Sequence, residues 1–523
     1  MLFKLYKSEI LRYNDVRIYY LMEALFFMKL DQLINGMENY KAKGDMDIEI
    51  TGVESNSKRI EPGMLFVAIR GFDFDGHDYV NEAIEKGAVA VVLDMNADFK
   101  KIKLTGNVTV IITENSRIAL ARIACNFYGN PSKKFKLIGI TGTKGKTTTT
   151  YMVKSILEKA GHKVGLIGTI ANYAGDKCLS MSTRTTPESL ELQRLFAEMV
   201  KEKVDYVVME VSSQSLKLHR VEGCHFDYAI FTNLYKDHIS SKEHPDIEDY
   251  FESKMKLFKM VKQGFTNNDD FKTPKLIKGV PTCNFKTYSI DNVSDYVAKD
   301  ITITNVSVDF KVKLDNRNER IKVNIPGRFS VYNALAAIAV TSSIGVKVDD
   351  IKEGLLEVIV PGRNELVSNK EELPIMIDYA HNPESLTNIL QAAKSYTKGR
   401  VIVVFGCGGD RDSEKRPIMG EIAGRIADYT IITSDNPRTE KPEDIVAQIE
   451  EGIKKTKGKY EVIVNRKEAI EKAIKMMNKR DLVILAGKGH EVYQEINGEK
   501  FDFDERVIVR EIVNELASDK KEG

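Results

Sequence analysis

Glycine, lysine and threonine residues with a spacing suited to phosphate binding lie between residues 139 and 150. The stretch reads Gly-Ile-Thr-Gly-Thr-Lys-Gly-Lys, followed by four threonines. Glycines allow backbone N–H groups to face a phosphate, Lys146 can reach its outer oxygens, and the Thr147 hydroxyl can ligate Mg²⁺. The inner glycine is Gly142, and the spacing from Gly139 to Gly145 is one residue longer than in the usual phosphate loop. The pattern predicts that this loop binds the phosphates of a nucleotide.

The segments on either side of the loop are those needed to position it. Residues 136–140 form an apolar run typical of a buried strand, and the apolar spacing of residues 151–159 is helical. A strand, a tight loop and a helix therefore follow one another. The helix N-terminus adds its partial positive charge to the loop, which favours a bound anion.

Two polar residues follow later strands of the same region. Glu210 lies near the end of the apolar run 205–211, and His238 follows the run 226–232. A carboxylate at the carboxyl end of a strand beside a phosphate loop is well placed for Mg²⁺, although a single glutamate can equally cap a helix. A lone histidine is more often structural. The residues alone therefore favour Glu210 as a magnesium ligand, and their spacing does not single out His238 or Lys254.

Length and composition exclude several classes of protein. A chain of 523 residues is too long for one core and predicts about three domains. The 77 basic and 76 acidic residues create no field that would favour nucleic acid or a membrane surface. No two of the five cysteines form a CxxC pair, which indicates reduced thiols in the cytoplasm. The cysteines are Cys125, Cys178, Cys224, Cys283 and Cys407.

The first 27 residues differ from the rest of the chain. Charged residues interrupt every apolar run before it could span a bilayer, and there is no continuous apolar centre of a signal peptide. Met28 would make a natural start. The preceding arm is therefore either an accessory helix or not part of the natural protein.

Further along the chain, the pattern predicts α/β units. Short strands and helices alternate from residue 48 to 113, and the alternation of polar and β-branched residues from 282 to 323 predicts antiparallel strands. Beyond residue 363, buried parallel strands are followed by polar loops at 406–412, 433–438 and 486–491. Ligands of open α/β sheets bind beyond the strand carboxyl ends, so these three loops predict one site. Gly408-Gly409 lacks the spacing of a dinucleotide fingerprint, which argues against an oxidoreductase.

Four motifs of this chain resemble those of the Mur ligases, and the resemblance runs from Met28 to the C-terminus. The motifs are Thr141–Thr148, Gly406–Asp412 with Lys415–Pro417, Asp435–Arg438, and Gly487–Glu491. The resemblance implies an α/β fold in three domains, with a central P-loop-type ATPase domain and a C-terminal Rossmann-like domain. The expected boundaries are an extension of unknown role at 1–27, a domain that binds a UDP-linked precursor at 28–131, the ATP-binding domain at 132–360 and the amino-acid-binding domain at 361–523.

The activity that the resemblance implies is ATP-dependent amide formation in cell-wall synthesis. The γ-carboxylate of D-Glu in UDP-MurNAc-L-Ala-D-Glu would be phosphorylated to an acyl phosphate, which an incoming amine attacks. A carboxylate is a poor electrophile because oxide cannot leave, and phosphorylation supplies the leaving group. The expected cofactors are ATP as co-substrate and Mg²⁺, and the expected state is a cytoplasmic monomer without nucleic-acid or membrane partners.

The resemblance also implies site residues. Lys146, Lys254 and His238 would be catalytic. ATP would contact Gly142, Thr143, Lys144, Gly145, Lys146, Thr147, Thr148, Asn333, Arg363 and Asp378. Mg²⁺ would be held by Thr147, Glu210, His238 and Lys254, the last as a carbamate. The UDP-MurNAc-dipeptide would contact Ser57, Thr185, Thr186, Ser212 and Arg220. The incoming amino acid would contact Arg411, Asp435, Asn436, Pro437, Arg438, Gly487 and Glu491.

Several positions depart from the family pattern. Lys144 and Arg184 stand where Asn is common, Gln214 stands where His is common, and Asn56-Ser57-Lys58 replaces Asp-Ser-Arg. Lys144 belongs to the ATP loop, and the departures at residues 56–58, 184 and 214 concern substrate contacts rather than the reaction.

The Asp-Asn-Pro-Arg motif ending at Arg438 resembles that of family members that add meso-diaminopimelate. The guanidinium of Arg438 offers a planar fork for the second carboxylate, which lysine lacks. Arg411 and Glu491 could hold a carboxylate and an ammonium of the same end. L-lysine, or an analogue such as lanthionine, is the alternative amino acid.

Other functions remain open from the sequence. A different Mur step or a folylpolyglutamate synthetase would share the ATP loop but not the three C-terminal loops. A nucleotide-binding protein without activity would retain the fold, but the intact set Lys146, Thr147, Glu210, His238 and Lys254 argues against it.

Overall fold

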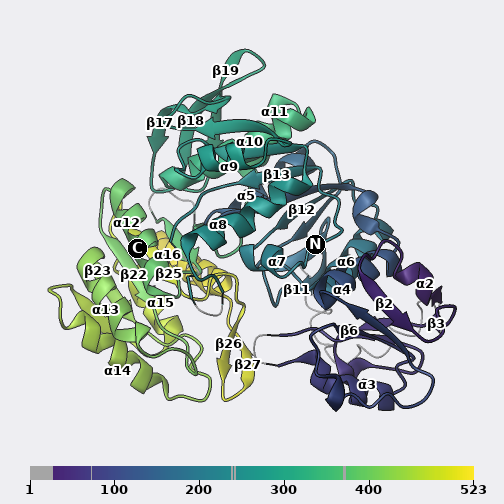
Figure 1. Cartoon of the computed structure of the whole chain (residues 1–523). Helices are drawn as coiled ribbons and strands as arrows, with labels where there is room; N and C mark the ends of the chain where they lie inside the picture. The colour runs from purple at the N-terminus through teal and green to yellow at the C-terminus, as the bar shows by residue number, and fades with distance from the viewer. Residues whose placement is uncertain (1–26, 72–73, 237–238, 241–242, 369–372, 523) are drawn as a thin grey trace.

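The computed structural model describes residues 27–71, 74–236, 239–240, 243–368 and 373–522. Three lobes are visible in Figure 1: the N-terminal lobe in purple, the central lobe in teal and the C-terminal lobe in green and yellow. The predicted extension lies outside the described residues except for Phe27. Within the described part of the chain, no helix is long and apolar enough to cross a membrane.

The N-terminal lobe contains a five-stranded sheet in the order β2-β7-β6-β5-β4, in which only β2 is antiparallel to its neighbour. Asn115 caps the longest described helix of this lobe, because its side chain accepts hydrogen bonds from the N–H groups of Arg117 and Ile118. The strands are β1 Met28–Lys29, β2 Tyr40–Lys43, β3 Glu49–Ile50, β4 Val53–Glu54, β5 Leu65–Val67, β6 Ala90–Asp94 and β7 Thr109–Thr113. The helices are α2 Leu30–Leu33, η2 Ser57–Arg59, η3 Gly76–Tyr79, α3 Val80–Glu85, η4 Phe99–Lys101, α4 Ser116–Phe127 and η5 Pro131–Lys133.

The central lobe contains a nine-stranded sheet in the order β11-β10-β9-β12-β8-β13-β14-β15-β16. Its strands are β8 Lys136–Thr141, β9 Val164–Ile167, β10 Ala171–Ala174, β11 Lys177–Met181, β12 Tyr206–Glu210, β13 Tyr228–Phe231, β14 Gln263–Asn267, β15 Asn284–Ser289 and β16 Tyr296–Val297. Its helices are α5 Lys146–Lys159, α6 Ser189–Lys201, α7 Ser213–Lys217, α8 Ile247–Met255, η6 Lys256–Met260, α9 Thr273–Gly279, α10 Arg328–Ile344 and α11 Val348–Glu357.

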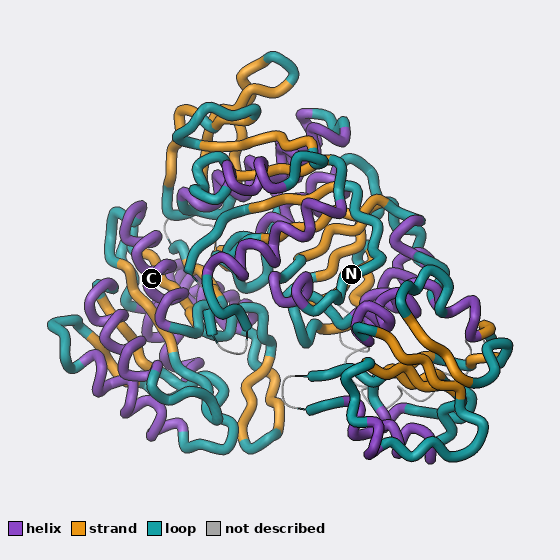
Figure 2. The backbone as a smooth tube through the Cα atoms, viewed as in Figure 1, coloured by secondary structure: helices purple, strands orange, loops and turns teal. Residues whose placement is uncertain are grey.

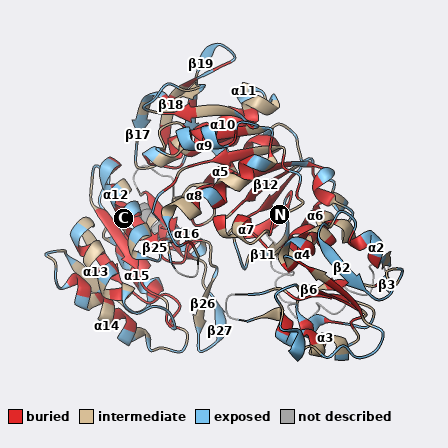
Figure 3. Ribbon diagram, in the orientation of Figure 1, coloured by how far each residue is buried: buried red, intermediate tan, exposed pale blue. Residues whose placement is uncertain are grey.

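The strand β8 lies between β12 and β13, and all three run parallel. Their carboxyl ends therefore meet at one edge of the sheet, where the loops that follow them form a common surface. Helices pack around these strands in Figure 2, and β8, β12 and β13 are almost entirely buried, as the red colour of β12 shows in Figure 3.

The expectation of antiparallel strands from 282 to 323 was partly wrong. The strands β15 and β16 extend the nine-stranded sheet in parallel, and only β17 Lys299–Ile303, β18 Val308–Leu314 and β19 Arg317–Val323 form an antiparallel sheet. Alternation reports that one face of a strand is exposed, and it contains no information about the direction of the partner strand.

The C-terminal lobe contains a six-stranded sheet in the order β20-β21-β25-β22-β23-β24, parallel except for β20. Apolar side chains cover both faces, as the continuous apolar runs predicted. The strands are β20 Glu365–Ser368, β21 Ile375–Asp378, β22 Val401–Phe405, β23 Tyr429–Ile432, β24 Tyr460–Val462 and β25 Leu482–Ala486, with a hairpin of β26 Tyr493–Ile496 and β27 Glu499–Asp502. The helices are α12 Pro383–Tyr396, α13 Lys415–Ile426, α14 Pro442–Ile453, α15 Arg466–Lys475 and α16 Glu505–Glu522.

Candidate active site

The loop between β8 and α5 has the shape of a phosphate cradle. Gly142 and Gly145 have φ values of +144° and +86°, which favour glycine. A Cβ atom on Gly142 would lie 1.9 Å from Thr232 Oγ1, and one on Gly145 would lie 2.4 Å from Asn333 Oδ1. Lys146 donates hydrogen bonds to the carbonyl oxygens of Gly142 at 3.0 Å and Thr143 at 2.9 Å. The loop therefore combines a helix N-terminus, two obligatory glycines and a lysine that lies over them.

Glu210 lies at the carboxyl end of β12, next to this loop. The Thr147 hydroxyl donates to the Glu210 carboxylate, with both Oε atoms at 3.0 Å, and both side chains are buried. The backbone N–H of Thr169 also donates to Glu210, at 2.8 Å. A carboxylate and a hydroxyl are the hard oxygen donors that Mg²⁺ prefers, and Mg²⁺ usually retains waters and phosphate oxygens as its other ligands. The pair therefore fits a magnesium ion that is also bound by a nucleotide.

Lys254 lies under the same loop although it comes from α8. Its ammonium donates to the Gly142 carbonyl at 2.8 Å and lies 4.3 Å from the centre of the Tyr250 ring. The Tyr250 hydroxyl donates to Thr143 Oγ1 at 3.2 Å. The lysine side chain is 1 % exposed. A buried amine next to the phosphate loop is consistent with a role in catalysis.

A cavity of about 250 Å³ adjoins the loop. The predicted substrate residues Thr185, Thr186, Ser212 and Arg220 line it, together with Lys146, Arg184, Ser213, Gln214, Glu243, His244, Tyr250 and Lys254. Four of these side chains are basic Lys or Arg and one is acidic. The cavity is therefore suited to an anionic ligand that approaches the phosphate loop.

Three arginines surround one glutamate beside this cavity. Glu188 lies 2.6 Å from Arg184, 3.0 Å from Arg220 and 3.3 Å from Arg117, which belongs to α4 of the N-terminal lobe. Burial lowers the pKa of Arg220, and the other two guanidinium groups act in the same direction while Glu188 opposes them. One carboxylate does not neutralise three cations, so a net positive charge remains where the two lobes meet.

The C-terminal lobe faces the phosphate loop with its own charged residues. Lys144 of the loop forms an ion pair with Glu384 at the start of α12. The Arg363 guanidinium lies 5.2 Å from the centre of the Tyr379 ring, and the Asn364 N–H donates to Asp378 at 2.9 Å. Burial raises the pKa of Asp378, while Arg363 opposes this shift. These residues lie at the carboxyl end of β21, on the edge expected for a ligand.

The three polar loops of the C-terminal lobe meet at that edge. The Lys488 ammonium donates to Asn436 Oδ1 at 2.9 Å and lies 3.4 Å from Glu491, while the Asn436 amide donates to Glu491 at 2.8 Å. Arg438 donates to the Gly409 carbonyl at 2.7 Å and forms an ion pair with Glu495 of β26 at 3.1 Å. The resulting arrangement of alternating charges is suited to a zwitterionic ligand.

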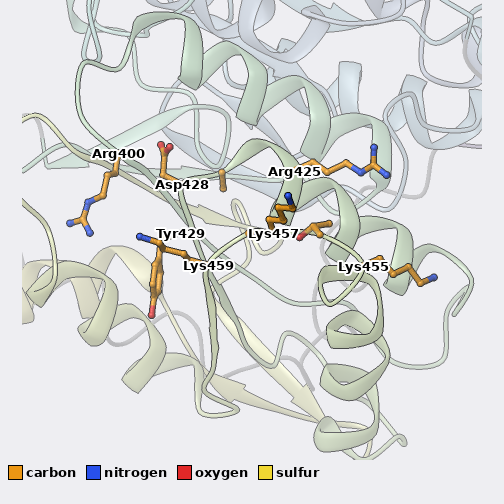
Figure 4. Close-up of a pocket in the computed structure, with 11 residues that line it drawn as sticks. Arg400, Arg425, Asp428, Tyr429, Lys455, Lys457 and Lys459 are labelled. Carbon is orange, nitrogen blue, oxygen red and sulfur yellow. Dashed lines mark hydrogen bonds between the residues drawn. The ribbon is translucent and has the colours of Figure 1, made fainter.

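A larger cleft of about 680 Å³ lies in the C-terminal lobe, and Figure 4 shows the residues that line it. It lies at the amino ends of β22, β23 and β24, so it occupies the edge of the sheet opposite to the three loops. Its labelled residues are Arg400, Arg425, Asp428, Tyr429, Lys455, Lys457 and Lys459. This cleft is therefore separate from the candidate active site.

Three family models match most of the chain. The Mur ligase family catalytic domain matches residues 49–128, the Mur ligase middle domain matches 140–341, and the Mur ligase glutamate ligase domain matches 362–489. This chain belongs to the Mur ligase family. The predicted three-domain α/β architecture of a Mur ligase is confirmed.

Curated relatives of this Mur ligase cover almost its whole length. The UDP-N-acetylmuramoyl-L-alanyl-D-glutamate--2,6-diaminopimelate ligase of Caldanaerobacter subterraneus is 50% identical over 93% of this chain and 99% of its own. A ligase of the same name, number 1 of Clostridium acetobutylicum, is 46% identical over 94% of this chain and 100% of its own. A solved structure of a ligase of this name has a TM-score of 0.69 and 27% identity, over 94% of this chain and 99% of its own.

The Mur ligase fold brings many of the predicted site residues together. The phosphate loop, Asn333, Glu210 and Lys254 are adjacent, and Thr185, Thr186, Ser212 and Arg220 line one cavity. Asp435, Asn436, Pro437, Arg438, Gly487 and Glu491 lie on neighbouring loops. Gly487 is required there, because its Cβ would lie 2.6 Å from Asp435 Oδ2.

Four predicted residues of the Mur ligase site lie outside the described residues, contact other side chains or are exposed. His238 lies outside the described residues. Ser57 is buried and its hydroxyl donates to Glu82 at 2.8 Å, so it does not line the cavity. The Lys144 side chain pairs with Glu384 rather than lying over the loop, and Arg411 is exposed.

Several residues of this Mur ligase site could not be recognised from the sequence. Lys488 lies within a predicted loop but was not assigned a role, and Glu495 belongs to a short hairpin that was not predicted. Glu188 and His244 carry no local signal, because their partners come from distant segments. The sequence contains a local signal only for the ion pair of Lys488 with Glu491, because these two residues have opposite charges and lie three positions apart.

Proposed function

We propose that this chain is an ATP-dependent ligase that adds meso-diaminopimelate to the γ-carboxylate of D-Glu in UDP-MurNAc-L-Ala-D-Glu, in peptidoglycan precursor synthesis. The relatives that cover almost the whole chain carry the corresponding ligase name. The observation that carries the proposal is that one chain contains both a phosphate loop and, in its C-terminal lobe, a polar and charged cluster of Asn436, Arg438, Lys488 and Glu491.

Phosphorylation of the precursor would use residues of the central lobe, and selection of the amino acid would use residues of the C-terminal lobe. Lys146, the backbone of the loop and the N-terminus of α5 would neutralise charge on the transferred phosphoryl group. Thr147 and Glu210, with His238, would hold Mg²⁺, which when bound neutralises the charge of the phosphates. The basic residues of the 250 Å³ cavity would hold the precursor so that its carboxylate faces the loop. The product of this step is an acyl phosphate, which contains the leaving group that a carboxylate lacks.

Amino-acid selection would depend on the C-terminal loops. Arg438 has φ of +52°, and its guanidinium is held by Gly409 and Glu495. A fixed planar fork binds a carboxylate in two parallel hydrogen bonds, which favours diaminopimelate over lysine. Glu491 and Arg411 would complete the contacts to the zwitterionic end.

We also propose that Lys254 is carbamylated, that the ligase is a cytoplasmic monomer, and that its domains end at residues 131 and 360.

The experiment that tests the function measures phosphate release from ATP with UDP-MurNAc-L-Ala-D-Glu. Meso-diaminopimelate, L-lysine, lanthionine and no amino acid are compared, and we expect stimulation by diaminopimelate. Arg438→Ala should lower this stimulation by about 10- to 200-fold, because one carboxylate contact of the transition state is removed. Stimulation by lysine alone would support the ligase activity and contradict the proposed specificity for diaminopimelate.

A matched control is Arg425→Ala, which removes an exposed arginine at the other edge of the same sheet. We expect wild-type rates for this variant. Equal losses in the two variants would show that Arg438→Ala acts through stability rather than recognition. No stimulation of the wild-type protein by any amino acid would favour a Mur-like nucleotide-binding protein without activity.

A further inference from the structure

Two buried side chains in the wall of the precursor cavity, Ser213 and His244, form a hydrogen-bonded chain with the partly exposed Asp249. His244 Nδ1 lies 2.6 Å from Asp249 Oδ2, and His244 Nε2 lies 2.9 Å from the Ser213 hydroxyl. The histidine is 1 % exposed and Ser213 is 5 % exposed, and both line the cavity. Serine, histidine and aspartate come from three segments, namely the first residue of α7, the loop before α8, and α8 itself. None of these residues has a role in the phosphate loop or the predicted magnesium site.

The hydrogen bonds of this chain define the direction of proton movement. The carboxylate of Asp249 can only accept, so Nδ1 of His244 carries the proton and Nε2 accepts from the Ser213 hydroxyl. Burial lowers the pKa of His244, Asp249 opposes this shift, and the ammonium group of Lys217 reinforces it. The Tyr250 ring packs against the imidazole at 5.0 Å between ring centres. The imidazole is therefore neutral near pH 7 and able to accept a proton.

The second half of the proposed reaction requires such an acceptor. The incoming amine is mostly an ammonium ion near neutral pH and has no lone pair until it loses a proton. The Ser213 hydroxyl lies in the same cavity as Lys146 of the phosphate loop, and this cavity is where the acyl phosphate would form. A group that takes the proton must be within hydrogen-bond reach of the amine, either directly or through one intervening hydroxyl or water.

We propose that Ser213, His244 and Asp249 form a proton relay that deprotonates the incoming amine, an inference that rests on the proposed ligase function. The ammonium would give one proton to Ser213 Oγ while the hydroxyl proton of Ser213 passes to His244 Nε2. The freed lone pair forms the C–N bond, the C–O bond to phosphate breaks with its electron pair, and the second amine proton leaves with the phosphate as HPO₄²⁻. His244 then returns its proton to solvent, and Asp249 positions the ring throughout.

The test separates amine activation from acyl-phosphate formation. Hydroxylamine is largely uncharged at neutral pH, so it attacks an acyl phosphate without a base and yields a hydroxamate. For His244→Gln and Ser213→Ala we expect amide formation with diaminopimelate to fall about 100-fold or more at pH 7, with hydroxamate formation within a few fold of wild type. The loss should shrink as the pH rises, because the amine then deprotonates in solution.

The control variant is His162→Gln, which alters a half-exposed histidine beyond the C-terminal end of α5, the end opposite the phosphate loop. It should keep both activities. Unchanged amide formation in His244→Gln would overturn the relay, and so would an equal loss of amide and hydroxamate, because that result indicates a damaged cavity. A wild-type protein that forms hydroxamate but no amide with any amino acid would contradict the proposed amino-acid step instead.

Discussion

Thr147 Oγ1 lies 3.0 Å from each carboxylate oxygen of Glu210, and both side chains are buried at the base of the phosphate loop. The hydroxyl thus orients the carboxylate that would face a magnesium ion. Replacing Thr147 with Val removes this hydrogen bond and one oxygen donor while preserving shape. We expect the apparent Mg²⁺ affinity to fall by about 10- to 100-fold, as measured by Mg²⁺ titration of phosphate release.

Thr150→Val is the matched control for this change. Thr150 lies one turn further along α5, and its hydroxyl donates to the Lys146 carbonyl at 2.8 Å rather than to a carboxylate. We expect its Mg²⁺ dependence to match that of the wild-type protein. Similar Mg²⁺ dependence in both variants would contradict a role for Thr147 in metal binding.

Lys254 is predicted to be required as a carbamate. Lys254→Ala should lose about 100-fold or more of the activity, because a buried charged group beside Gly142 disappears. Acetate or another short carboxylic acid should partly restore phosphate release by replacing the acidic group. Lys259→Ala, which alters an exposed lysine in η6, should have normal activity without acetate. Normal activity of Lys254→Ala would contradict the proposal that a carbamate on Lys254 is required.

The ion pair between Lys144 and Glu384 connects the phosphate loop to the C-terminal lobe. Both side chains are more than a third exposed, so the pair contributes only about 0–1 kcal/mol and weakens in salt. We expect Glu384→Gln to increase the radius of gyration measured by small-angle X-ray scattering without ligand. High salt should produce the same increase in the wild-type protein. A variant with an unchanged radius of gyration would show that other contacts hold the lobes together.

Arg466 and Glu505 form a buried ion pair at 2.8 Å in the C-terminal lobe. Both are almost fully buried, and Arg466 also donates to the Ala486 carbonyl at 2.9 Å. Glu505→Gln leaves Arg466 with only Asp435, 3.9 Å away, as a counter-charge, so we expect a loss of about 3 kcal/mol in the free energy of unfolding of this lobe. Urea denaturation measures this change. Glu511→Gln, which affects an exposed pair with Lys467, should cost no more than about 1 kcal/mol.

His490 makes the stability of the C-terminal lobe dependent on pH. Burial, together with Arg363 and Arg506, lowers its pKa from 6.5 to about 4 in the folded protein. The unfolded chain therefore takes up this proton first as the pH falls, so the contribution is complete above pH 6.5 and is lost progressively towards pH 4. His490→Asn should show a smaller fall in Tm between pH 6.5 and 4. An equal fall in both proteins would contradict this assignment.

Much of the fold could be predicted because its signals are local. The continuous apolar run of β22 predicted a buried parallel strand, and the glycines, Lys146 and Thr147 predicted a phosphate loop before α5. The directions of β15 and β16 could not be predicted, because the partners of a strand come from distant parts of the chain. The hairpin β26–β27 was also missed, since its short strands are largely exposed and lack a clear apolar face.

Residue types and their spacing identify the segments that carry the chemistry: the loop at Gly142–Thr147, the acid Glu210 at the end of a strand, and the three polar loops of the C-terminal lobe. Which side chains meet depends on the folded chain, as for Glu188 with Arg117 and Ser213 with His244. The reason is physical: residue type and spacing set local backbone shape, whereas a contact between distant segments depends on strand order, helix packing and the resulting positions of the loops.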